Sequence, residues 1–238
     1  MNCPNCDQKI RGKYCPNCGQ PTELPRIDMK YIIQEIGSVL SFKKGILFTI
    51  KELLIRPGQN VKTFIHEDRN RLVKPIIFVI FCSFIYTILQ QLLHFEDAYV
   101  RYTENSIDSV TLAIFQWIQA NYGYANILMA IFFAFWIKLL FRKYGYNFFE
   151  ILILLCFIFG IGMLIYSFFG VIEALSQLGL FQVGGLIGFV YTSWAIAQFF
   201  DVRKKMNYVK GLLAYILGLL SFSIAATAVG VLADLIIK

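Results

Sequence analysis

The chain has 238 residues, of which 58% are apolar and only 16% are charged, whereas an average soluble domain carries about 25% charged residues. The apolar residues fall in long uninterrupted runs, and a helix needs roughly 20 such residues to cross a bilayer core. The formal net charge is +7. Because the basic residues flank the apolar runs, a membrane accounts for them, and we do not expect nucleic acid as a partner. An ordinary soluble domain is therefore excluded.

Residues 1–20 carry two short cysteine pairs, Cys3 with Cys6 and Cys15 with Cys18, each separated by Pro-Asn. Two cysteines at this spacing turn both sulfurs toward one ion, and two such pairs complete a tetrahedral shell of four thiolates. We therefore predict a zinc ribbon that holds one Zn²⁺. All four coordination positions are filled by thiolates, so the ion is expected to fold the module and not to catalyse a reaction.

Disulfide bonds and a redox-active dithiol are the alternatives for these four cysteines. A cytoplasmic N-terminus disfavours disulfides, because cytosolic thiols are kept reduced. Two matched pairs disfavour a single redox dithiol. The two remaining cysteines, Cys82 and Cys156, lie alone inside apolar runs, and we expect them to pack as small apolar side chains.

A proline-containing linker at 21–26 leads into a region of cytoplasmic amphipathic helices at 27–74. These helices are expected to lie on an anionic membrane surface, or to form a helical hairpin packed on the transmembrane bundle, and the two arrangements are compatible. One stretch places its apolar residues on one side: Ile46, Leu47, Ile50, Leu53 and Leu54. The residues assigned to membrane-surface binding are Lys43, Lys44, Lys51, Arg56, Arg69, Arg71 and Lys74.

Five apolar spans make up a transmembrane domain at 75–238, so the predicted fold class is an all-α integral membrane protein. The spans are 75–95, 124–141, 148–170, 180–200 and 211–237. A helical pattern around Trp117, in the loop after the first span, indicates an interfacial helix or a short helix packed on the bundle.

The charges of the connecting loops alternate along the chain. The flank before the first span and the loops after the second and fourth spans are basic, whereas the loop after the first span is acidic and the loop after the third has no basic residue. Basic loops stay in the cytoplasm. We therefore expect a multi-pass protein of the cytoplasmic (inner) membrane, with its N-terminus in the cytoplasm and its C-terminus outside.

Small residues four positions apart predict close contacts between membrane helices, because they let helix backbones approach one another. These helix-packing residues are Gly184 and Gly188, Ala214 and Gly218, and Ala226 and Gly230. The few ionisable residues of the spans lie near the span ends, which disfavours ion-coupled transport. Motifs for zinc proteases, serine hydrolases and phosphate-binding loops are missing, so we expect no enzymatic activity.

The N-terminal third of the chain resembles an uncharacterised bacterial family of zinc-ribbon multi-pass membrane proteins, a domain of unknown function. The resemblance rests on the ribbon at 12–20, on Lys43-Lys44-Gly45 and Leu54-Ile55-Arg56-Pro57-Gly58, and on Arg69, Arg71 and Pro75. It covers residues 1–80, and it departs from the family at Asp7, where glycine is common. The five-span layout also resembles, more weakly, the Yip membrane-trafficking family. No established activity comes with either resemblance.

We expect a non-enzymatic membrane adaptor or organiser whose cytoplasmic zinc ribbon binds another protein. The expected partners are the lipid bilayer, anionic lipids, an unknown cytosolic protein and a second copy of the chain in a homo-oligomer. The alternative is a transporter or channel with a passive path between the glycine-rich helices. Flux into liposomes would distinguish the second function from the first.

Overall fold

The computed structural model describes residues 45–95, 109–176 and 179–237, and residues 2, 3, 6, 8, 9, 12 and 15–18 of the N-terminal module. The chain divides into two compact units, Met1–Ser41 and Phe42–Lys238. The predicted linker lies outside the described residues, as do Lys43 and Lys44.

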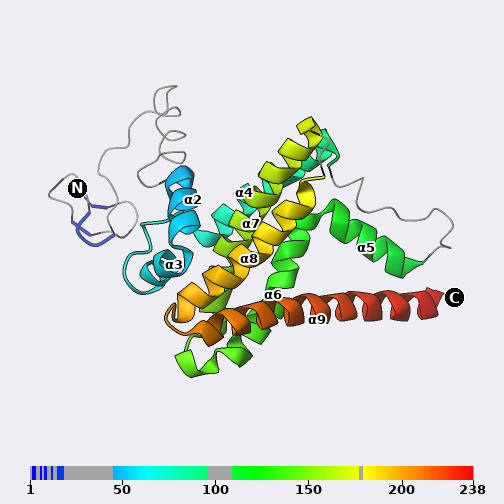
Figure 1. The fold of residues 1–238 in the computed structure, drawn as a ribbon. Helices are drawn as coiled ribbons and strands as arrows, with labels where there is room; N and C mark the ends of the chain where they lie inside the picture. Colours follow the sequence, from blue (N-terminus) through cyan, green and yellow to red (C-terminus); the bar gives the residue numbers. More distant parts are fainter. Residues whose placement is uncertain are drawn as a thin grey trace. The chain divides into compact units, whose positions relative to one another are not determined.

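Within the described ranges, the second unit is built from helices (Figure 1). These are α2 (Ile46–Ile55), α3 (Pro57–His66), α4 (Pro75–Leu93), α5 (Val110–Ala120), α6 (Tyr122–Leu140), the short η1 (Arg142–Tyr144), α7 (Phe148–Ser176), α8 (Phe181–Phe200) and α9 (Lys205–Ile237). Five of them, α4, α6, α7, α8 and α9, are long and apolar enough to cross a membrane. The helical, multi-pass fold predicted from the apolar runs is therefore confirmed.

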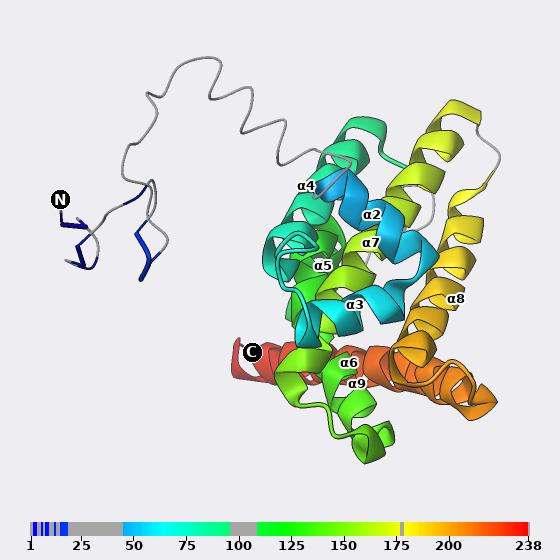
Figure 2. The same ribbon diagram turned by 90° about the vertical axis from the view of Figure 1, so that its left-hand side faces the viewer.

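Two of these helices extend beyond the predicted spans. α7 continues to Ser176 and α9 begins at Lys205, because backbone hydrogen bonding carries a helix past the apolar stretch until a residue or a turn stops it. Between α7 and α8, Gly179 has a positive φ of 67°, which glycine adopts without strain. α9 has 33 residues, or about 50 Å at 1.5 Å per residue, so it is longer than a bilayer core. Figures 1 and 2 show α9 running across the direction of α7 and α8.

Helix α7 is central, with α4 packed along one part of it and α8 along another. α9 packs on α6, α8 and α5. Large aromatic side chains occupy the fully buried positions between the helices, among them Phe78, Tyr86, Phe133, Phe157 and Phe199. The bundle is thus held by rings that fill the space between helices, since burial from water supplies no driving force between helices inside lipid.

Helices α2 and α3 lie across one end of the bundle (Figure 2). α2 packs on α7, and α3 packs on α7 and α8. Ile46, Thr49 and Leu53 are the buried residues of α2, whereas Leu47 and Leu54 are exposed. The exposure of Leu47 and Leu54 shows that the bundle does not cover the whole apolar side of this helix. At 100° per residue the five apolar residues lie on one side of the helix, within an arc of about 120°, and the bundle covers the edge of that arc that holds Ile46 and Leu53.

Candidate metal centre and basic face

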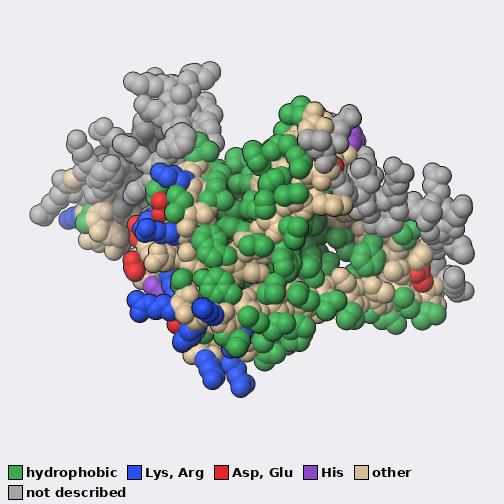
Figure 3. Space-filling model, viewed as in Figure 1, with side chains coloured by type: hydrophobic (Ala, Val, Ile, Leu, Met, Phe, Trp, Pro, Cys, Tyr) green, Lys and Arg blue, Asp and Glu red, His purple; other side chains and the backbone are tan. Residues whose placement is uncertain are grey.

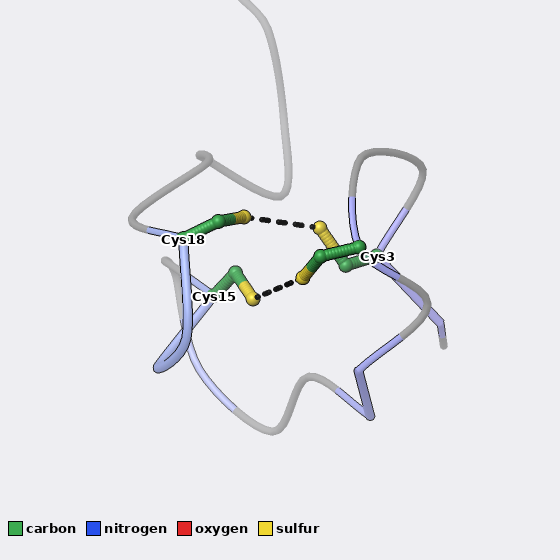
Figure 4. Close-up of side chains that lie close together, drawn as sticks. Cys3, Cys15 and Cys18 are labelled. Carbon is green, nitrogen blue, oxygen red and sulfur yellow. Dashed lines mark hydrogen bonds between the residues drawn. The ribbon is translucent and has the colours of Figure 1, made fainter.

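The four predicted metal ligands lie together. The sulfurs of Cys3, Cys6, Cys15 and Cys18 are all within 4.8 Å of one another, and all four cysteines are free thiols. The Cys3 and Cys18 sulfurs are 3.5 Å apart, and the Cys6 and Cys15 sulfurs are 3.6 Å apart (Figure 4). A tetrahedral zinc ion with bonds of about 2.3 Å separates its sulfur ligands by about 3.8 Å. The cluster therefore has the dimensions to hold a metal ion.

Short-range backbone contacts shape the first cysteine pair. Asn2 and Lys9 form an isolated antiparallel bridge, and the Cys3 amide donates to the Gln8 carbonyl at 3.0 Å. These contacts join the residues on either side of Cys6, whose sulfur lies within 4.8 Å of the Cys3 sulfur. The second pair lies on a turn that includes residues 16–18. The two pairs together place four sulfurs around one point.

Burial within the cluster is uneven. Cys3 and Cys15 are buried, Cys6 is half-buried and Cys18 is exposed. Among the described residues of the module, the apolar cluster consists of Cys3, Cys15 and Cys6 alone. A module with so small an apolar core needs a metal or disulfides to fold. The thiol donor set fits Zn²⁺, and four thiolates would leave the ion no open position for a substrate.

The second predicted site, the basic face, lies at the end of the helical unit that α2 and α3 cover. Lys51, Arg56, Arg69 and Lys74 are exposed there. Arg71 instead forms an ion pair with Glu52 at 2.9 Å. Lys and Arg side chains gather on the same side of the molecule, over α2 and α3 and over the nearby ends of the long helices (Figure 3). The rest of the visible surface of the bundle is mainly apolar.

Three lysines of this face bind carbonyl groups at or near the ends of helices. Lys62 donates to the Phe200 carbonyl at 3.2 Å, and Lys210 donates to the Leu140 carbonyl at 3.2 Å. Lys138 donates to the Tyr146 carbonyl. Burial lowers the pKa of the Lys62 amine below its usual value, and the opposing effect of the nearby Asp201 and Tyr144 is smaller. The last carbonyls of α6 and α8 have no partner within their helices, so a cation is favoured at these ends.

Two contacts fix α2 and α3 onto α8. The Gly58 amide donates to the Gln198 side-chain carbonyl at 2.7 Å, and the buried Tyr191 hydroxyl donates to the Leu53 carbonyl at 3.1 Å. A Cβ on Gly58 would lie 2.2 Å from the Phe199 amide nitrogen. Glycine is therefore required at the point where α3 touches the backbone of α8. A sequence pattern gives no sign of this contact, because residues 140 positions apart make it.

The predicted helix-packing residues contact side chains more than backbones. Added Cβ atoms would meet the Phe169 side chain at Gly184, the Phe133 ring at Gly218 and Thr111 at Gly230. Gly188 lies at ordinary contact distance from Tyr166. Ala214 is fully buried, and Ala226 is half-buried. The space left by glycine in α8 and α9 is thus taken up by bulky side chains of neighbouring helices.

Sequence reasoning missed one polar contact on the opposite side of the unit. The Asp234 carboxylate, near the end of α9, accepts hydrogen bonds from the Ser109 hydroxyl at 2.8 Å and the Val110 amide at 2.6 Å. It also accepts from the Thr111 hydroxyl at 3.0 Å. Asp234 therefore caps the first turn of α5 from a distant part of the chain, and this binds α5 to α9.

Comparison with known protein families finds a match for one segment of the chain. Residues 44–87 match the model of a family described as "Protein of unknown function (DUF3667)". The matched segment runs from just before α2 into α4, so it holds α2, α3 and the exposed basic residues between α3 and α4. No curated protein and no solved structure matches the chain. This segment thus resembles an uncharacterised family, and the likeness to Yip proteins stays a prediction.

Proposed function

We propose that this protein is a non-enzymatic adaptor or organiser of the cytoplasmic membrane. In this proposal its N-terminal module binds one structural Zn²⁺ through Cys3, Cys6, Cys15 and Cys18, and the zinc ribbon docks a cytosolic protein or a second copy of the chain. The observation that carries the proposal is the cluster of four sulfurs within 4.8 Å, in a unit of its own apart from the helical unit. A closed thiolate site supports a binding module and disfavours a catalytic one.

The basic face supports the membrane part of the proposal. Exposed Lys51, Arg56, Arg69 and Lys74 gather at one end of the helices. Each basic residue near an anionic leaflet contributes about 1 kcal/mol to membrane association. On α2 the exposed Leu47, Leu54 and Ile55 lie on the same side of the helix as Lys51. A helix surface that carries both apolar and basic side chains suits the boundary between lipid headgroups and acyl chains. We propose that this end faces the cytoplasm.

The alternative, a transporter or channel, draws on a small cavity between the helices whose mainly apolar lining includes several polar side chains. Tyr122, Asn126, Tyr166, Thr192 and Tyr215 contribute to its lining. Its volume is about 30 Å³, which is room for about one water molecule. A path for a larger solute would need the helices to separate, so the cavity gives this alternative less support than the cysteine cluster gives the adaptor.

The test compares proteins captured with three forms of the full-length chain after crosslinking in cells. The forms are wild type, Cys15→Ser/Cys18→Ser, and Cys82→Ser/Cys156→Ser as a control that also removes two thiols. The adaptor function predicts a partner, or a second copy of the chain, that is held by wild type and by the control and is lost from the ribbon variant. Identical partners for all three forms, with solute flux into liposomes that the ribbon variant retains, would favour the transporter.

A further inference from the structure

A large groove opens in the helical unit beside the basic face. Its volume is about 990 Å³, and it lies between α4, α6 and α7 next to the end of α3. Val79, Ala130 and Phe159 form a buried floor, whereas Ile76 and Phe149 on its rim are more than half exposed. All of these residues are apolar, so the body of the groove suits a hydrocarbon chain.

The mouth of the groove is charged. Arg69, Lys74, Asn147 and Glu150 line it. The Glu150 carboxylate accepts from the Asn147 amide at 2.7 Å, and the Asn147 side chain accepts from the Glu150 amide at 2.8 Å. These two residues therefore cap the start of α7 together. Within the described ranges, neither Arg69 nor Lys74 forms an ion pair, so both cations are available to an anion at the mouth.

The depth of the groove matches one leaflet of a bilayer. Along α7 its lining runs from Phe149 to Phe159, ten residue steps or about 15 Å at 1.5 Å per residue. This is half of a hydrocarbon core of about 30 Å. The groove starts beside the basic mouth, where α4 and α7 both begin, and ends near the middle of the membrane. The charged mouth thus corresponds to the headgroup of a lipid molecule, and the apolar body of the groove corresponds to an acyl chain.

We propose that this groove is a binding site for an anionic glycerophospholipid from the leaflet on the basic side. The phosphate lies at the mouth between Arg69 and Lys74, near the first amide groups of α4, where a helix favours an anion. One acyl chain runs along the floor toward Cys156 and Phe159. A peptide or a second copy of the chain suits the site less well. A bound backbone brings many hydrogen-bonding groups, and only the few polar side chains at the mouth could pair with them. The site does not depend on what the zinc ribbon binds.

Native mass spectrometry of the full-length protein in mild detergent tests the site. The protein is titrated with phosphatidylglycerol or with phosphatidylcholine of the same acyl chains. Wild type is expected to bind one phosphatidylglycerol in preference to phosphatidylcholine. Arg69→Gln/Lys74→Gln is expected to bind phosphatidylglycerol about 25-fold more weakly, since each basic residue contributes roughly a factor of five. Arg203→Gln/Lys205→Gln removes the same charge from exposed positions where α8 joins α9 that do not line the groove, and it should bind as wild type does.

A second pair of variants tests the apolar part of the groove. Cys156→Phe adds a ring at the deep end and should weaken binding of both lipids at least tenfold. Val190→Phe adds a ring to an exposed apolar position of α8 and should change neither. Equal loss of phosphatidylglycerol in the two charge variants would mean that surface charge alone attracts lipid, and would overturn the site. So would equal affinity of wild type for the two lipids, unchanged binding by Cys156→Phe, or a lipid-free dimer as the only species.

Discussion

At the scale of single residues, glycines in this protein make room for other groups. Cβ atoms built on Gly160 and Gly218 would lie 2.6 Å and 2.8 Å from the rings of Phe78 and Phe133, and both rings are almost fully buried. Gly58 differs, because its neighbour is the backbone at Gln198 and Phe199. A ring can rotate away from an added methyl group, whereas a helix backbone cannot move without shifting the whole element.

Replacing Gly58 with alanine should therefore destabilise the helical unit. The new Cβ would lie 2.2 Å from the Phe199 amide nitrogen, and forcing the two helices apart costs about 1–3 kcal/mol. Thermal unfolding of the purified protein in detergent measures the change. Gly162→Ala is the matched control, because a Cβ there meets nothing within 4 Å and alanine favours a helix. An unfolding temperature for Gly58→Ala equal to that of the control would contradict the close contact.

At the scale of elements, α5 is held by a residue of another helix. It has no buried residues and no side-chain cap of its own at Ser109, and the Asp234 carboxylate of α9 accepts the hydrogen bonds of its first turn. Trp117 remains 49% exposed. Packing on α9 therefore still leaves the tryptophan open to the headgroup region, so the two predictions for this helix are compatible.

We expect Asp234→Ala to release the first turn of α5. Loss of a capping oxygen costs about 1 kcal/mol, which corresponds to about fivefold faster hydrogen exchange of the amides at the start of α5. Asp234→Asn keeps an acceptor oxygen at the same place and should lose much less protection. If the two variants exchanged equally fast, or neither differed from wild type, the cap would not hold α5 in place.

The elements differ in how far the sequence predicts them. The positions of the long helices follow from hydropathy, because the bilayer sets a minimum apolar length. Which helices pack against each other does not follow from hydropathy, because a helix such as α9 is apolar on every side and has no single face that identifies its neighbour. The cysteine cluster was predictable because metal geometry fixes the spacing of its ligands. The roles of Gly58, Lys62 and Asp234 were not, since each depends on a group more than 100 positions away.

At the scale of the whole molecule, the basic residues of separate loops meet at one end. Arg142 and Lys143 follow α6, Arg203 and Lys204 follow α8, and the exposed basic residues around α2 and α3 lie at the same end (Figure 3). Such a gathering of positive charge is typical of the cytoplasmic side of a membrane protein. It supports the proposed orientation independently of where each span begins and ends.

Reporter fusions test this orientation. A reporter enzyme that works only in the cytoplasm should be active when it is fused after Lys143 and silent when it is fused after Lys238. Five spans put these two points on opposite sides of the membrane. The reverse pattern would mean that the basic end lies outside, and activity at both points would mean that α9 does not cross the membrane.

The zinc content of the purified full-length protein tests the central claim most directly, namely that a metal-folded module is attached to a membrane bundle. Four thiolates within 4.8 Å should hold one zinc ion per chain, and the ion should remain after Cys82→Ser/Cys156→Ser, because these two cysteines lie in α4 and α7 and are not part of the four-sulfur cluster. Cys15→Ser/Cys18→Ser should lose the zinc, because two ligands do not complete the tetrahedral site. Wild-type protein without zinc, or undiminished zinc in Cys15→Ser/Cys18→Ser, would contradict the account.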